Sequence, residues 1–181
     1  MILSHYYEKG RIPFLTLSDL SDGEAVKIHA RYESGKNNFA MRNHDGNYIS
    51  HRRMVESKLY SKFVEKGGKP KRRTPHYMIL GEYVGSKRWF NDTCKITIPL
   101  DSFNKCMVSF TYGDSFPTFI APSFGRTDWH LDNIYTYDEI LDIIKEHGMP
   151  QGQTAKEPVD HAHPNYIEAQ IWYDEIINQY R

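Results

Sequence analysis

The sequence predicts a single α+β domain, with a mostly antiparallel sheet and about three helices. Two observations lead to this prediction. Amphipathic segments with capping signals occupy much of the first third, and short β-branched and aromatic runs follow, separated by Gly, Asp, Asn and Pro. The chain of 181 residues has the length of one hydrophobic core rather than two. We therefore expect residues 1–181 to fold as one unit.

Two helices are predicted in the first half of the chain. The first spans 21–33 and begins with an S-x-x-E capping box formed by Ser21 and Glu24. A stretch rich in Gly and Asn then predicts a loop. The second helix spans 49–68, and Gly67 marks its C-terminal end. Its apolar residues recur at a spacing of four: Val55, Leu59 and Phe63.

Four runs after this helix predict neighbouring antiparallel strands: HYMILGEYV, CKITIPL, CMVSFTY and FPTFI. TYGDS, residues 111–115, has the composition of a hairpin turn between two of them. A third helix is expected over 136–148, where Thr136 and Glu139 form a second capping box. A polar loop, 149–160, then leads to a last strand, YIEAQIWYDE, and a short helical turn.

Composition excludes several classes of protein. Aromatic residues make up 14% of the chain, which argues against intrinsic disorder. The two cysteines, Cys94 and Cys106, fall in strand-like segments without a zinc or catalytic motif, so we expect a reducing compartment. No apolar run approaches the roughly 20 residues that span a bilayer, and the N-terminus has no signal-peptide pattern. We expect a cytoplasmic protein without a membrane partner.

The formal net charge of zero conceals a charge asymmetry. Residues 52–73 contain nine lysines and arginines against two glutamates, whereas the chain from Asp128 onward contains eleven acids against three bases. Such a dipole can steer a phosphate-bearing ligand, or it can be neutralised by ion pairs within the protein. We favour the ion pairs.

Glu168, in the last predicted strand, is the leading candidate for chemistry. Alternation places Ile167, Ala169, Ile171 and Tyr173 on a core face, with Tyr166, Glu168, Gln170 and Trp172 opposite. If the second face lines a cleft, Glu168 can bind a ribose hydroxyl, stabilise an oxocarbenium ion or act as a base, with Gln170 and Trp172 contacting substrate. The alternative is a solvated glutamate on an edge strand.

Further candidates lie at strand ends and in the basic segment. His76 and Tyr77 open the predicted strand after Pro75, and His5 precedes two tyrosines near the N-terminus. These residues can donate protons, form hydrogen bonds or stack on a ring of a ligand. The alternative is a structural role, in which backbone groups satisfy their hydrogen bonds or their rings anchor a strand. Four arginines are candidates for phosphate contacts: Arg52, Arg53, Arg72 and Arg73.

Asp160, His161 and His163 have the side chains of a zinc or iron site. This spacing is common by chance, so we expect no metal and keep a metal-dependent hydrolase as an alternative. The chain lacks the P-loop, Rossmann, zincin and α/β-hydrolase motifs.

The segments HYYEKG, KGGKP with PHYMILG, SFTYGDS and YIEAQIW stand in this order along nearly the whole chain. As a set they resemble a family of small uncharacterised bacterial proteins, whose activity is not settled. The chain also resembles, more weakly, the ADP-ribosyltransferases, which bind NAD between a His or Arg on an early strand, an aromatic residue and a late catalytic Glu. That likeness implies catalytic roles for His5, Tyr77 and Glu168, although the Ser-Thr-Ser stretch of the family is absent.

Three functional hypotheses follow from these features. The leading hypothesis is an ADP-ribosyltransferase-like enzyme that cleaves NAD and modifies an unknown target, with Glu168 at the ribose and the basic turn at the pyrophosphate. The second is a module without catalytic activity that binds nucleic acid or a protein partner through residues 52–73. The third is the metal-dependent hydrolase.

Overall fold

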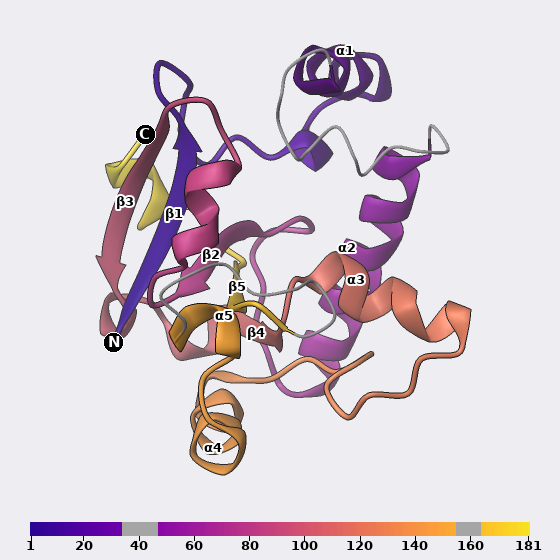
Figure 1. The fold of residues 1–181 in the computed structure, drawn as a ribbon, viewed down its shortest axis with the longest axis vertical. Coiled ribbons are helices and arrows are strands. Elements are labelled where there is room, and N and C mark those ends of the chain that lie inside the picture. Colours follow the sequence, from indigo (N-terminus) through magenta and orange to yellow (C-terminus); the bar gives the residue numbers. More distant parts are fainter. Residues whose placement is uncertain (34–46, 155–163) are drawn as a thin grey trace.

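The computed structural model describes residues 1–33, 47–154 and 164–181. Within these ranges the chain forms five strands and five α-helices, joined by short 3-10 turns. In chain order they are β1 (Ile2–Glu8), α1 (Asp22–Glu33), α2 (Tyr48–Glu65), β2 (His76–Leu80), β3 (Thr93–Pro99), β4 (Val108–Tyr112), α3 (Ser115–Ile120), α4 (Tyr137–His147), α5 (Gln151–Thr154) and β5 (Ile167–Ile171). This confirms the predicted α+β class. Figure 1 shows α1 and α4 at opposite ends of the molecule.

The strands form one antiparallel sheet in the order β3-β1-β2-β5-β4. β5 is therefore an inner strand, paired with β2 on one side and β4 on the other. β1 pairs with β3 along seven residue pairs but with β2 only at Leu3–Leu80 and Ser4–Ile79. Beyond Ser4 the two strands separate, and the sheet is split between β1 and β2.

Helices cover both faces of the sheet. On one face, isoleucines of α4 pack into the same hydrophobic core as Ile167, Ala169 and Ile171 of β5. On the other face, α2 places Val55, Leu59 and Phe63 against Trp172. All five residues of β5 are buried as a result. The predicted division of this strand into two faces is confirmed, but neither face meets bulk solvent.

The three predicted helices are present, with ends that shift by up to three residues. α4 has the expected capping box: the Thr136 side chain accepts from the Glu139 N–H, and the Glu139 carboxylate accepts from the Thr136 N–H. At Ser21 the box is incomplete, because the Ser21 hydroxyl donates to the Glu24 carboxylate. The expected final helical turn is the 3-10 turn Ile177–Gln179.

Several local predictions were wrong. FPTFI forms most of α3 rather than a strand, because Asp114 accepts a hydrogen bond from the Phe116 N–H at 2.9 Å and so caps a helix. TYGDS is consequently a strand-to-helix connection and not a hairpin turn. The predicted neighbours β3 and β4 lie at opposite edges of the sheet, since β1, β2 and β5 separate them. The loop expected over 149–160 includes α5 in its described part.

The two cysteines have free thiols, Cys94 half-buried and Cys106 exposed. Among the helices that the structure describes, none combines the length and apolar character needed to cross a membrane.

Candidate functional site

A cavity of about 510 Å³ lies at the split between β1 and β2. Its volume falls within the roughly 300–1,000 Å³ of small-molecule sites. Five of the predicted site residues line it: His5, Arg52, His76, Tyr77 and Glu168. The split in the sheet thus brings together side chains from β1, β2, β5 and α2.

Glu168 lies at the floor of this cavity and is only 8% exposed. Its Oε1 accepts hydrogen bonds from the Ser115 N–H at 3.3 Å and from Gln170 Nε2 at 3.1 Å. Its Oε2 accepts none from the residues that the structure describes. Burial, and secondarily the charge of Asp114, raise the pKa of Glu168 from 4.5 to about 7. The carboxyl group can therefore gain or lose a proton near neutral pH.

A chain of buried hydrogen bonds holds Glu168 in place. Trp172 Nε1 donates to Ser109 Oγ at 2.8 Å, and Ser109 Oγ donates to Gln170 Oε1 at 2.9 Å. Gln170 in turn donates to Glu168. Both Gln170 and Trp172 are fully buried and neither lines the cavity. The sequence predicted that Gln170 and Trp172 contact substrate. The structure instead places both residues behind Glu168, outside the cavity.

Tyr77 is linked to α2 through polar contacts. Its hydroxyl donates to Glu56 Oε1 at 3.0 Å, and the Arg52 guanidinium lies over its ring at 4.4 Å from the centroid. Arg52 Nε is 3.2 Å from Glu56 Oε1, and its Nη1 donates to the Tyr48 hydroxyl at 3.0 Å. Burial raises the pKa of Tyr77 well above its usual range. The Tyr77 hydroxyl is thus held protonated, with one ring face covered by Arg52.

Tyr77 and Glu168 share one face of the sheet. Tyr77 is paired with Gln170, and Glu168 with Ile79, so the two residues are diagonal neighbours on adjacent strands. Diagonal positions lie about 7–8 Å apart, within reach of long side chains. The hydrogen bonds from Ser115 and Gln170, and after them the positive charge of Arg52, which lines the same cavity, lower the pKa of Glu168 and partly oppose the effect of burial.

His5 bridges the split with both of its ring nitrogens. Nδ1 lies 3.0 Å from the Tyr77 carbonyl oxygen, to which it donates, and Nε2 accepts from the Phe14 N–H at 2.9 Å. The Phe14 ring stacks on the imidazole at 3.9 Å. Burial lowers the pKa of His5 to about 4, so the ring is neutral at physiological pH. In this arrangement His5 joins β1 to β2 where the backbone ladder has ended.

His76 faces the other side of β2. Its Nε2 lies 2.8 Å from Asp174 Oδ1, whereas its buried Nδ1 has no hydrogen-bond partner within the described residues. Burial lowers the pKa of His76. Because Asp174 also accepts from Arg72, His76 belongs to a polar cluster at the C-terminal end of β5.

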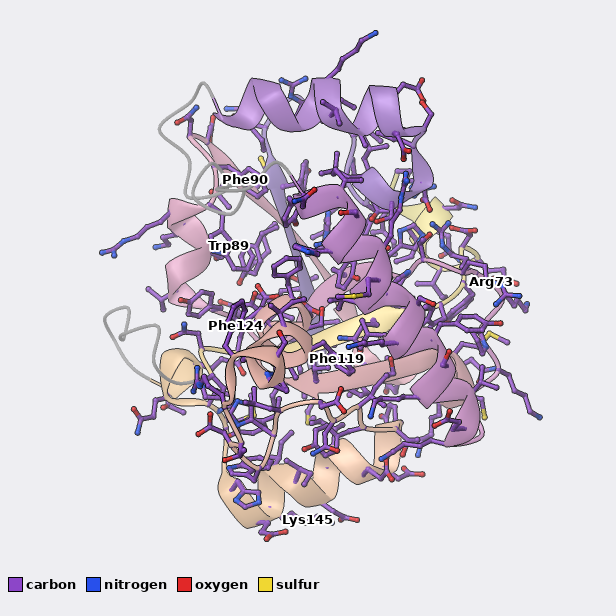
Figure 2. The ribbon with its side chains drawn as sticks, turned by 90° about the vertical axis from the view of Figure 1, so that its right-hand side faces the viewer. Arg73, Trp89, Phe90, Phe119, Phe124 and Lys145 are labelled. Carbon is purple, nitrogen blue, oxygen red and sulfur yellow. The ribbon has the colours of Figure 1, made fainter. Side chains whose placement is uncertain are left out.

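Arg53, Arg72 and Arg73 do not line the cavity. Arg53 pairs with Asp22, Arg72 pairs with Asp19 and Asp174, and Arg73 lies over the Tyr60 ring at 4.6 Å. Figure 2 shows Arg73 on the opposite side of the molecule from Trp89 and Phe90, which border the cavity. The structure thus separates the basic turn from the cavity, contrary to the prediction that it meets the pyrophosphate there.

The charge asymmetry is neutralised largely within the protein. Basic residues of 52–73 pair with acids of the C-terminal part, and the pairs are Lys62–Asp132, Lys66–Glu139, Lys71–Glu175 and Arg72–Asp174. These contacts confirm the ion-pair interpretation.

The proposed metal ligands Asp160, His161 and His163 lie outside the described residues. Across ranges 1–33, 47–154 and 164–181, no group of three or more His, Cys, Asp or Glu side chains could hold a metal ion.

Sequence reasoning placed Tyr166 on the face of Glu168 but missed Trp89 and one carboxylate. Trp89 contacts Tyr6 edge-on at 5.9 Å and Tyr166 at 5.6 Å, and these rings border the cavity. Their positions depend on long-range contacts that no local pattern reveals. Glu56, in contrast, has a local signal: it interrupts the apolar stripe of α2 four residues after Arg52.

Comparison of the chain with models of known protein families, with curated proteins and with solved structures found no match. The resemblances drawn from its motifs remain predictions. The function is therefore inferred from the geometry of the cavity.

Proposed function

We propose that the protein is an ADP-ribosyltransferase-like enzyme that cleaves NAD in the cavity between β1 and β2. One observation carries the proposal. Glu168, buried on an inner strand, shares a ligand-sized cavity with Tyr77 and Arg52, and one of its carboxylate oxygens accepts no hydrogen bond from the described residues. A carboxylate so placed suits a ribose hydroxyl and the charge that develops beside it.

The reaction breaks the bond between ribose C1′ and the nicotinamide nitrogen, and the bonding electron pair leaves with nicotinamide. The oxocarbenium ion that develops on the ribose is stabilised by the negative charge of Glu168. An acceptor oxygen or nitrogen then forms a new bond to C1′ and releases a proton. Without a target, water is the acceptor, and the products are nicotinamide, ADP-ribose and a proton.

The other cavity residues supply binding. Arg52 Nη2 has no partner among the described residues, so its N–H groups suit a phosphate oxygen or a hydroxyl. Because Arg52 covers one face of the Tyr77 ring, only the other face is open for stacking. Trp89 and Tyr166 offer further aromatic surface for a planar heterocycle. His5 positions β1 against β2 and does not transfer protons.

The test compares NAD turnover by wild-type protein and a Glu168→Gln variant, measured as nicotinamide release. We expect a loss of about 100-fold or more, because glutamine keeps the size of the side chain and removes its charge. Glu65→Gln is the matched control, since Glu65 is exposed on α2 and outside the cavity. Wild-type protein that neither binds nor cleaves NAD, or a folded Glu168→Gln variant with full turnover, would refute the proposal.

A further inference from the structure

Glu56 is a buried carboxylate in a helix whose neighbouring positions are core. Its side chain is 1% exposed, and the adjacent Val55 and nearby Leu59 pack against Trp172. A buried ion pair is weak evidence for stability, because apolar residues of similar size stabilise such positions as well or better. The presence of Glu56 here therefore calls for a reason other than packing.

The contacts of Glu56 point toward the cavity. Its Oε1 accepts from the Tyr77 hydroxyl at 3.0 Å and lies 3.2 Å from Arg52 Nε, and both partners line the cavity although Glu56 does not. Its Oε2 is buried without a partner in the described part of the chain. One oxygen atom thus holds two cavity side chains that come from different elements, β2 and α2.

We infer that Glu56 is a positioning residue: it fixes the direction of the Tyr77 hydroxyl and the plane of the Arg52 guanidinium, and so sets the hydrogen-bonding polarity of the cavity. The inference rests on the proposed function for its activity readout. Because the Tyr77 proton is donated to Glu56, the phenolic oxygen can only accept from a ligand. Because Nε of Arg52 faces Glu56 and Nη1 donates to Tyr48, Nη2 is the nitrogen left to donate to a ligand.

The first test measures NAD binding by calorimetry and NAD turnover for wild type, Glu56→Gln, and the control Glu65→Gln. We expect Glu56→Gln to lower kcat/KM about 10- to 100-fold, because small displacements of positioned groups have effects of this size. Glu65→Gln should match wild type. A folded Glu56→Gln variant with wild-type kcat/KM and affinity would overturn the inference.

Coupling to Tyr77 distinguishes positioning from a structural role. If Glu56 acts through the Tyr77 hydroxyl, adding Tyr77→Phe to Glu56→Gln causes less further loss than Tyr77→Phe does in the wild-type background. Fully additive losses contradict the inference. If Glu56→Gln fails to fold, Tyr77→Phe alone decides: we expect a loss of about 10-fold, and full turnover would overturn the inference.

A readout that needs no substrate separates this inference from the proposed function. Glu56 contributes to the raised pKa of Tyr77 through its charge and its hydrogen bond. Titration of phenolate absorbance, as the difference between each protein and its Tyr77→Phe counterpart, should show Tyr77 ionising at lower pH in Glu56→Gln, compared over the pH range in which both proteins remain folded. If wild type does not cleave NAD, the proposed function fails while this shift still supports the positioning of Tyr77. An unchanged titration would overturn the inference whatever the substrate.

Discussion

Replacing Glu168 with glutamine removes a buried charge while keeping the length and shape of the side chain. Glutamine Oε1 can still accept from the Ser115 N–H and from Gln170, so the two hydrogen bonds of the carboxylate are retained. The new amide N–H group would face the cavity and the neighbouring Asp114 carboxylate. We expect the variant to be more stable than wild type at high pH and to turn over NAD about 100-fold or more slowly.

The magnitude follows from the pKa of Glu168. Burial raises this pKa from 4.5 to about 7. Each tenfold change in proton affinity corresponds to about 1.4 kcal/mol, so ionising Glu168 in the folded state costs about 3 kcal/mol. Between pH 4.5 and 7 the folded protein binds more protons at this site than the unfolded chain, so the contribution to stability falls as pH rises. The cost is complete above pH 7 and absent below pH 4.5.

Urea unfolding of wild type and Glu168→Gln at pH 4.5, 6 and 8 measures this effect. The difference in unfolding free energy should be near zero at pH 4.5 and reach about 3 kcal/mol in favour of the variant at pH 8. For a chain of this length that corresponds to a rise in Tm of about 6–12 °C. Glu65→Gln, at an exposed position, should show no such trend. A difference that is constant across this pH range would refute the reasoning.

Two further predictions concern His5 and Trp172. His5→Ala should lower the unfolding free energy by about 2 kcal/mol or more, because the Tyr77 carbonyl and the Phe14 N–H both lose their partner; thermal unfolding measures this, and an unchanged Tm would show that the imidazole does not hold β1 to β2. Trp172→Phe should lower the unfolding free energy by about 2 kcal/mol, because packing and the hydrogen bond to Ser109 are lost. The affinity for NAD, measured by calorimetry, should change less than about threefold. A large loss of affinity with little loss of stability would instead indicate that Trp172 contacts the ligand.

The fold was predictable where short-range pattern decides structure. The period of two in β5 follows from which side chains are apolar, and both packing faces agree with it. The cap of α4 is equally local, because Thr136 and Glu139 satisfy each other. FPTFI was wrongly predicted as a strand because its aromatic residues favour strands. Asp114, just before it, caps a helix through its side chain, and residue propensities do not account for such a cap.

The cavity was not predictable from the sequence, because it depends on strand order and on where pairing stops. His5 and Tyr77 are 72 residues apart, and their contact exists because β1 and β2 separate after Ser4. Nothing local indicates that β5 lies between β2 and β4, which is why a solvated glutamate on an edge strand remained a valid alternative for Glu168. The order of the strands removes that alternative.

The cost of burying Glu168 and Glu56 bears on function as well as stability. A fold selected only for stability would place apolar or neutral residues at both positions, since each buried carboxylate opposes folding unless it is well paired. Glu56 is paired with Arg52, whereas one oxygen of Glu168 accepts no hydrogen bond from the described part of the chain, and the pKa of Glu168 is about 7. Buried ionisable groups that lower folding stability are expected at binding and catalytic sites. There the protein loses some stability, and the charges are held in position for the ligand. Glu56 contacts Arg52 and Tyr77, and Glu168 lines the same cavity as these two residues. This cavity should therefore be tested before any other surface of the protein.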